Sequence, residues 1–153
     1  MIIVTGATGT LNGATVDFLL KRMPAHDIGV SVRDPSRATH LADQGVRVRQ
    51  GSYDDPSALR HSFAEAEQVL LVSSSDLTAD VVAQHHRAID AAVDVGAQRI
   101  VYTSAHGTAF DTPYPPACDP RRHRTASRSV GRRLDRNAQW LLWGPNPAAR
   151  CVG

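Results

Sequence analysis

The stretch that decides the fold is IIVTGATGTLNGATVDFLL, residues 2–20. The apolar run IIVT has the length of a strand, and Gly6 and Gly9 separate it from a segment with helical periodicity. Glycines at such a junction allow a tight turn that brings the amides of the helix N-terminus close to a pyrophosphate. The stretch therefore predicts a strand, a phosphate-binding turn and a helix. A turn of the same shape without a ligand is the alternative.

The glycine pattern departs from the usual fingerprint at its third position, where Asn12 stands in place of glycine. The Cβ of Asn12 opposes a close approach of helix and strand at this point, and a shift of register to Gly13 would relieve it. We expect the apolar residues of the predicted helix, residues 10–23, to pack on the sheet from one face. These residues are Leu11, Val16, Leu19 and Leu20.

Apolar runs of strand length recur along the chain, and helical patterns or helix-start signals fill the gaps between them. Nearly continuous apolar strands joined by helices are typical of a parallel sheet covered on both faces. The sequence up to about Ser104 therefore predicts an α/β fold, a Rossmann-like doubly wound sheet of about five strands. After the first strand, the predicted strands are 27–33, 46–51, 67–74 and 98–105, and the predicted helices are 10–23, 35–44, 56–66 and 79–95.

Several of the predicted helices carry end signals in the sequence. Asp34 and Asp55 each precede a proline, which is typical of an N-capping side chain followed by the first helical residue. Gly45 and Gly96 stand where a helix C-cap requires a left-handed backbone. These signals support the alternation of strands and helices.

The end of the second predicted strand, VSVRDPSRA, bears on the choice of dinucleotide. An NAD-binding chain places Asp or Glu there for the ribose 2′-hydroxyl, whereas this chain has Arg33, with Arg37 one turn later. A pair of guanidinium groups neutralises a 2′-phosphate, so the sequence favours NADP as cofactor. The alternative is that both arginines are solvated, with Asp34 paired to Arg33.

Polar residues follow other predicted strands at the carboxyl edge, where ligands bind in such sheets. Tyr53 and Asp54 follow the third strand, and we expect them to border the adenine. Ser73, Ser74 and Ser75 follow the fourth strand, and we expect them beside the nicotinamide ribose. For each of these residues, an ordinary polar loop position is the alternative.

The sequence identifies no catalytic residue. Short-chain dehydrogenases use a Tyr-x-x-x-Lys pair, but Lys21 is the only lysine, so that mechanism is excluded. Hydride transfer to a quinone needs no such pair. Tyr102 ends the fifth strand at the active edge, and His106 lies in the loop beyond it. We expect His85 and His86 on the solvated face of their helix rather than at a ligand.

The first part of the chain resembles the NmrA-like atypical short-chain dehydrogenase family, in particular its NAD(P)H:quinone oxidoreductase type 2 branch. The resemblance covers residues 1–119 and is specific when its motifs are taken together. The matching stretches are IIVTGATGTL, LLKRMPAHDIGVSVRDPSRA, GVRVRQGSYDDPSAL, VLLVSSS, QHHRAIDAAVDVGAQRIVYTSA and DTPYPPACD.

The resemblance implies a Rossmann fold that binds NADPH and reduces quinones or similar small acceptors. Some family members bind the dinucleotide as regulators without turnover, so an NADP(H)-binding redox-sensing module is the alternative function. The residues that the resemblance assigns to the cofactor are Gly6, Ala7, Thr8, Gly9, Thr10, Leu11 and Arg33.

Length and composition set further limits on the chain. Its 153 residues have room for one main domain, which we place at residues 1–109, followed by a Pro-rich loop at 110–119. Cys118 and Cys151 lack the spacing of a zinc site or a disulfide framework, so we expect no metal. No apolar run reaches the roughly 18–20 residues of a membrane span. We expect a cytoplasmic protein without a membrane partner, and a homodimer is an open alternative.

Residues 120–153 differ from the rest of the chain in charge. They contain 8 Arg against 1 Asp, whereas residues 1–119 contain 9 Lys and Arg against 14 Asp and Glu. A basic arm that binds nucleic acid is one interpretation, but the segment lacks interleaved aromatic residues for base stacking. We therefore expect no nucleic-acid partner.

Our interpretation of residues 120–153 is an out-of-frame translation product that begins after Asp119. Reading residues 120–144 one base out of step yields HAATEQRVAASGAAWTAMRSGFYG with permitted codons, which resembles the family pattern DHxATE and SGxxWTxLRNGFY. Trp140 and Trp143 have a single codon each, and both become glycine in the other frame, on either side of the expected FY. We then expect a disordered tail, NADPH binding that is weak or absent, and little quinone reductase activity. The nucleotide sequence at the Asp119 codon tests this interpretation.

Overall fold

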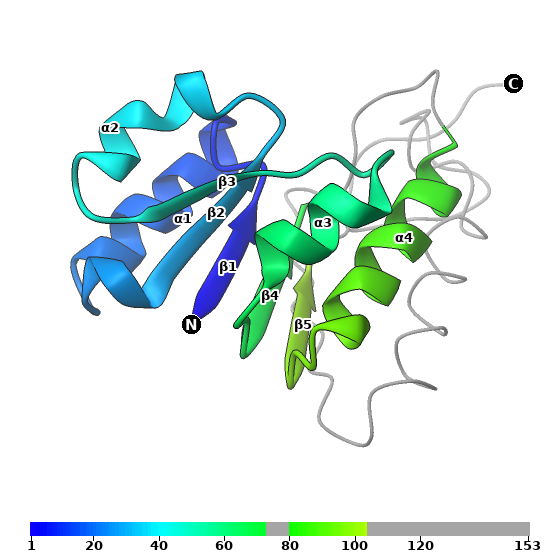
Figure 1. The fold of residues 1–153 in the computed structure, drawn as a ribbon. Coiled ribbons are helices and arrows are strands. Elements are labelled where there is room, and N and C mark those ends of the chain that lie inside the picture. Colours follow the sequence, from blue (N-terminus) through cyan, green and yellow to red (C-terminus); the bar gives the residue numbers. More distant parts are fainter. Residues whose placement is uncertain (73–79, 104–153) are drawn as a thin grey trace, which may run out of the picture.

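The computed structural model describes residues 1–72 and 80–103. These residues form one parallel sheet with helices on both faces (Figure 1). The strand order β3-β2-β1-β4-β5 matches the first strands of a doubly wound dinucleotide-binding fold, with its switch point between β1 and β4. The predicted fold class is therefore confirmed. The strands are β1 (Ile2–Thr5), β2 (Ile28–Val32), β3 (Arg47–Gln50), β4 (Gln68–Leu71) and β5 (Arg99–Tyr102).

The helices connect successive strands and divide between the two faces of the sheet. Helices α1 and α2 cover one face, and α3 and α4 cover the other (Figure 1). This division follows from parallel strands joined by right-handed crossovers on both sides of the first strand. The helical elements are α1 (Thr10–Leu20), the 3-10 helices η1 (Ala25–Asp27) and η2 (Pro35–Ala38), α2 (Thr39–Ala42), α3 (Pro56–Phe63) and α4 (Val81–Asp94).

The central strand β1 supplies both apolar cores, because successive side chains of a strand point to opposite faces. Val4 lies in one core with Val16 of α1, and Ile3 lies in the other with Phe63 of α3. All four side chains are fully buried. Complete burial of an aliphatic or aromatic side chain contributes about 1.5–3 kcal/mol, so the two cores hold β1 as a rigid platform.

Helix α1 begins at Thr10 as predicted but ends at Leu20 rather than Met23. Val16 is fully buried, whereas Leu11, which we expected on the same face, is 46% exposed. The prediction for Leu11 is therefore wrong. Five helical positions separate Leu11 from Val16, which places them about 140° apart around the axis, so Leu11 lies on a flank of the helix.

The predicted helix ends are confirmed. Asp34 accepts a hydrogen bond from the backbone amide of Ser36 at 3.0 Å, and Asp55 caps α3 in the same way through the amides of its first residues. Gly45 and Gly96 adopt φ values of +88° and +79°, in the left-handed region that C-caps require.

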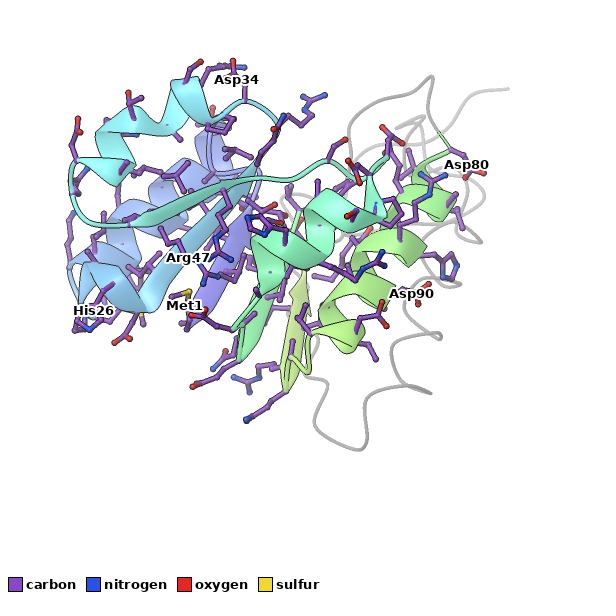
Figure 2. The ribbon with its side chains drawn as sticks, in the orientation of Figure 1. Met1, His26, Asp34, Arg47, Asp80 and Asp90 are labelled. Atoms are coloured by element: carbon purple, nitrogen blue, oxygen red, sulfur yellow. The ribbon has the colours of Figure 1, made fainter. Side chains whose placement is uncertain are left out.

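The carboxyl ends of the parallel strands share one edge of the sheet. Asp34 and Asp80, which begin helical segments, lie at this edge, and Met1 and His26 lie at the opposite one (Figure 2). Within the described part of the chain, no helix has the length and apolar character needed to cross a bilayer. The Pro-rich loop and the basic tail fall outside the described residues, so what we expect of them stays a prediction.

Candidate functional site

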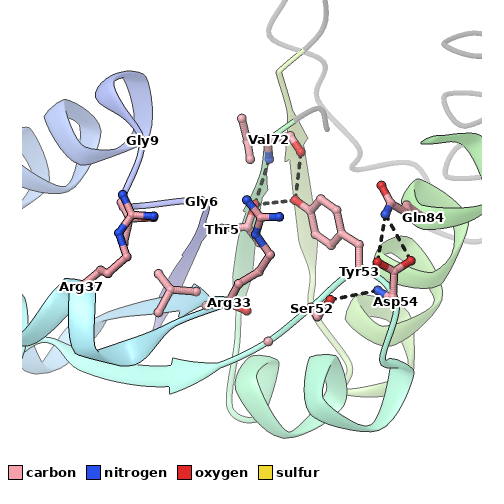
Figure 3. A pocket seen from close by; sticks show the side chains of 14 residues that line it. Thr5, Gly6, Gly9, Arg33, Arg37, Ser52, Tyr53, Asp54, Val72 and Gln84 are labelled. Carbon is pink, nitrogen blue, oxygen red and sulfur yellow. Dashed lines mark hydrogen bonds between the residues drawn. The ribbon is translucent and has the colours of Figure 1, made fainter. Parts of the chain in front are cut away.

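A pocket of about 590 Å³ opens at the carboxyl edge of the sheet, beside the switch point between β1 and β4 (Figure 3). Its size lies within the range of roughly 300–1,000 Å³ that is usual for small-molecule sites. Segments that follow β1, β2, β3 and β4 contribute to it, together with one residue of α4. The lining residues are Thr5, Gly6, Thr8, Gly9, Ser31, Val32, Arg33, Arg37, Gly51, Ser52, Tyr53, Asp54, Val72 and Gln84.

The glycine turn after β1 has the geometry that the sequence predicts. Gly6 has a φ of +64°, and a Cβ at this position would lie 2.6 Å from Cγ1 of Val72. The amide of Gly9 donates to the carbonyl oxygen of Gly6 at 2.9 Å, which closes the turn. No side chain caps the N-terminus of α1 at Gly9. The first amides of α1 therefore suit an anion such as a diphosphate.

Asn12 does not disturb the packing of α1 on β1, contrary to the concern that its Cβ raised. Its side chain is buried, and Nδ2 donates to the carbonyl oxygen of Thr5 at 2.5 Å. The close approach falls at Gly13, where a Cβ would lie 3.1 Å from the carbonyl oxygen of Ala7. Oδ1 of Asn12 is buried without a hydrogen-bond partner among the described residues. The shift of register to Gly13 is thus observed.

Arg33 and Arg37 form the cationic side of the pocket, and both side chains are exposed. Within the described residues, neither arginine forms a salt bridge. Asp34 does not neutralise Arg33, because its carboxylate binds the hydroxyl and amide of Ser36. These hydrogen bonds, with a smaller contribution from Arg37, lower the pKa of Asp34. The two guanidinium groups are therefore available to an anionic ligand.

The other end of the pocket is rich in hydrogen-bond acceptors. Nε2 of Gln84 donates to both carboxylate oxygens of Asp54 at 3.1 Å, so α4 is tied to the loop after β3. Arg87 donates to the same carboxylate at 3.2 Å. Asp54 is exposed, so its ion pair with Arg87 contributes at most about 1 kcal/mol. The pocket thus combines a cationic end with an acidic end.

Tyr53 extends from the loop after β3 to the exits of β1 and β4 (Figure 3). Its hydroxyl lies 2.7 Å from Oγ1 of Thr5 and 2.9 Å from the carbonyl oxygen of Val72. Burial of the phenol raises the pKa of Tyr53 to about 12, although the hydrogen bond with Thr5 opposes the shift. The phenol therefore remains neutral near pH 7.

His85 occupies a position that the sequence analysis did not anticipate. We expected it on the solvated face of its helix, but its side chain is only 2% exposed. Nδ1 lies 3.0 Å from the hydroxyl of Tyr102, whose ring packs edge-to-face against the imidazole. The prediction for His85 is wrong because α4 turns this position toward β5. Tyr102 is buried as well, and neither residue lines the pocket.

The structure places the proposed cofactor residues in different surroundings. Gly6, Thr8, Gly9 and Arg33 line the pocket, whereas Ala7 is buried in the core behind the turn. Thr10 and Leu11 lie in the first turn of α1 and are not part of the lining. Ser73 and Ser74 fall outside the described residues.

Sequence reasoning missed several lining residues. Gly51 carried one usable signal, since a glycine ends the third strand, and a Cβ there would overlap the hydroxyl oxygen of Ser31. No local signal distinguished the others, because they enter the pocket only through the order of the strands. The missed residues are Thr5, Ser31, Val32, Gly51, Ser52, Val72 and Gln84.

The strand order, the glycine turn at the exit of β1 and the pocket at the switch point define a Rossmann-like α/β protein. The sequence profile of the NmrA-like family matches residues 1–113. The chain belongs to the NmrA-like family, as the resemblance of its motifs indicates.

Individual relatives agree with this assignment. Quinone oxidoreductase 2 of Escherichia coli K12 is 42% identical over 104 residues, which are 68% of this chain and 36% of that protein. The triphenylmethane reductase of Citrobacter sp., solved in complex with NADP(H), has a TM-score of 0.81 at 33% identity. The match covers 92% of this chain and 48% of the reductase chain. The chain spans about a third of the length of the curated relatives it matches.

The E. coli quinone oxidoreductase has also been solved in complex with NADPH. That structure has a TM-score of 0.78 at 34% identity, and the match covers 93% of this chain and 47% of the E. coli chain. Both dinucleotide complexes therefore share the described fold with this chain.

Proposed function

We propose that the chain binds NADPH across this pocket and serves hydride transfer to a quinone or a similar small acceptor. The observation that carries the proposal is the pair of exposed arginines, Arg33 and Arg37, beside a glycine turn that leads into an uncapped helix N-terminus. The pair matches a 2′-phosphate, and the helix N-terminus matches a diphosphate. The NADPH and NADP(H) complexes of the relatives support the same cofactor.

The residues of this chain would have separate tasks toward the cofactor. The Gly6–Gly9 turn and the first amides of α1 would hold the diphosphate, and Arg33 with Arg37 would hold the 2′-phosphate. Ser73 and Ser74 remain our proposal for the nicotinamide ribose. Bound NADPH supplies the hydride, and the protein supplies binding and orientation.

Titration of the purified 153-residue protein with NADPH and with NADH, followed by nicotinamide fluorescence, tests the cofactor assignment. We expect saturable binding of NADPH and affinity for NADH that is at least about tenfold weaker, because a charge-assisted 2′-phosphate contact is lost. Equal affinities would contradict the role of the arginines. The absolute affinity also tests our expectation, drawn from the out-of-frame interpretation of residues 120–153, that NADPH binding is weak or absent.

A redox-sensing module that binds NADP(H) without turnover is the second candidate. It is favoured by the pocket itself, because Tyr53, the one phenol among the described lining residues, has a pKa of about 12 and donates to a backbone carbonyl. Lys21, the only lysine in the sequence, directly follows α1. Its side chain is exposed and does not line the pocket. Oxidation of NADPH on addition of a soluble quinone indicates an enzyme, whereas saturable binding without oxidation indicates a sensor.

We further propose a cytoplasmic location and a homodimer. Sedimentation velocity over a range of concentrations tests the dimer, and a monomer throughout would contradict it.

A further inference from the structure

Tyr53 connects parts of the site that are distant in sequence. It belongs to the loop after β3, yet its hydroxyl lies between the exits of β1 and β4 (Figure 3). The switch point of the sheet falls between these two strands, and a dinucleotide in such a fold binds across it. The side chain of Tyr53, which follows the outer strand β3, therefore reaches the crevice at the switch point between β1 and β4.

The hydrogen bonds of Tyr53 close a ring. The amide of Val72 donates to Oγ1 of Thr5 at 2.9 Å, and Tyr53 Oη donates to the carbonyl oxygen of Val72 at 2.9 Å. Each hydroxyl has one proton, so Oγ1 of Thr5 donates to Tyr53 at 2.7 Å. The competing contact of Thr5 with the carbonyl oxygen of Leu70 is longer, at 3.2 Å. Both backbone groups of Val72 are thus satisfied by side chains.

The ring also determines the space over the glycine turn. Cγ1 of Val72 would lie 2.6 Å from a Cβ at Gly6, so the side chain of Val72 occupies the place that a larger residue at Gly6 would need. Any movement of Val72 therefore changes the contact between the exit of β4 and the phosphate-binding turn. Holding Val72 in place holds these two parts of the site relative to each other.

We propose that Tyr53 is a positioning residue that couples the exit of β4 to the phosphate-binding turn, so that its hydroxyl favours a complete dinucleotide over an isolated adenosine half. This inference rests on the proposed binding of NADPH. The adenosine half would contact the turns after β1 and β2, whereas the nicotinamide half would lie beyond the switch point, on the side of β4. The nicotinamide half therefore depends more strongly than the adenosine half on where Val72 lies.

The ring of Tyr53 packs against the core beneath α3 and α4, and phenylalanine would preserve that packing. Tyr53→Phe therefore removes the hydroxyl and leaves the loop in place. Thr5→Val removes the other hydroxyl of the hydrogen-bonded ring, and Thr5→Ser retains it. Thr15→Val is the matched control, because among the described residues the Thr15 hydroxyl binds the carbonyl oxygen of Leu11 in its own helix and no group of the pocket.

The test compares NADPH with adenosine 2′,5′-bisphosphate, which represents the adenosine half alone, by calorimetric titration of each variant. Tyr53→Phe and Thr5→Val are expected to weaken NADPH binding about tenfold and to change bisphosphate binding less than about twofold. Thr5→Ser is expected to recover most of the NADPH affinity that Thr5→Val loses, and Thr15→Val is expected to leave both affinities near the wild-type values. The ratio of the two affinities in one protein sample does not depend on how much of that sample is folded.

Two outcomes overturn the inference alone, namely an equal loss of affinity for both probes in Tyr53→Phe, or no loss for either. Failure of the wild-type chain to bind either probe would instead overturn the proposed function, and the inference with it. Wild-type binding of the bisphosphate but not of NADPH would also refute the coupling, because the intact ring would then have no effect on a complete dinucleotide.

Discussion

Asn12 donates a hydrogen bond from its side-chain amide to the carbonyl oxygen of Thr5, which ties the first turn of α1 to the end of β1. A glycine at this position would make no such bond. The site therefore differs from the usual fingerprint by an added polar contact rather than by a lost one. Because Oδ1 of Asn12 has no partner in the described part of the chain, the contact also has a desolvation cost.

Replacement of Asn12 by aspartate is expected to destabilise the fold by about 3 kcal/mol, because a carboxylate would be buried against a carbonyl oxygen and the donor would be lost. Asn12→Ala is expected to cost about 1 kcal/mol, since the hydrogen bond and the unpaired oxygen disappear together. Urea denaturation measures both free energies of unfolding. Aspartate tolerated as well as alanine would show that burial of a carboxylate beside the carbonyl oxygen of Thr5 has no extra cost.

Gly6→Ala is expected to destabilise the protein by about 2–4 kcal/mol and to abolish NADPH binding, because a positive φ and the contact with Val72 both oppose a Cβ. Gly96→Ala is the matched control. Gly96 also has a positive φ, but nothing lies within 4 Å of its Cβ position, so the cost there is about 1 kcal/mol of backbone strain. Thermal unfolding and NADPH titration of both variants separate the backbone strain from the steric contact with Val72. Equal losses of stability in the two variants would argue against that contact.

Arg33→Ala and Arg37→Ala are each expected to weaken NADPH binding about tenfold while leaving NADH binding nearly unchanged, because only NADPH carries the 2′-phosphate. The NADPH affinity of the wild type should also fall with rising salt, since both side chains are exposed. Arg60→Ala serves as the control, because Arg60 pairs with Asp94, and neither residue lines the pocket. A parallel loss of NADH affinity would assign the arginines to another part of the dinucleotide.

Tyr53 is expected to make the protein sensitive to alkaline pH. Its pKa rises from 10.0 to about 12 on folding, so its contribution to stability is complete below pH 10 and is lost as the pH rises through 12. The contribution is at most about 2 kcal/mol, because part of the residue is exposed and solvent screens the phenol. Free energies of unfolding of the wild type and of Tyr53→Phe between pH 8 and pH 12 measure it. If the free energies of unfolding of the two proteins changed in parallel with pH, the raised pKa of Tyr53 would be refuted.

The sequence was sufficient for the elements of the fold and for the position of the glycine turn after β1. Caps at Asp34 and Asp55 and left-handed glycines at positions 45 and 96 act on neighbouring backbone groups, so their effects appear in the local sequence. Periodicity was less reliable for individual side chains. It placed Leu11 on the packed face of α1, but the helix turns this residue to its flank.

The partners of polar side chains could not be predicted in the same way. His85 bonds Tyr102 across 17 positions, and Tyr53 bonds Thr5 across 48. Such pairs depend on which strands are neighbours and on how a helix is rotated over them. Neither property is a local preference of the chain.

The amino-acid sequence alone therefore determined the alternation of strands and helices, the tight glycine turn after β1 and the presence of cationic side chains after β2, because these follow from preferences within a few residues. Only the tertiary structure decided that Tyr53 would reach Thr5 and Val72. The reason is the strand order, which places β4 beside β1 and so brings side chains from distant segments within hydrogen-bonding distance at one edge of the sheet.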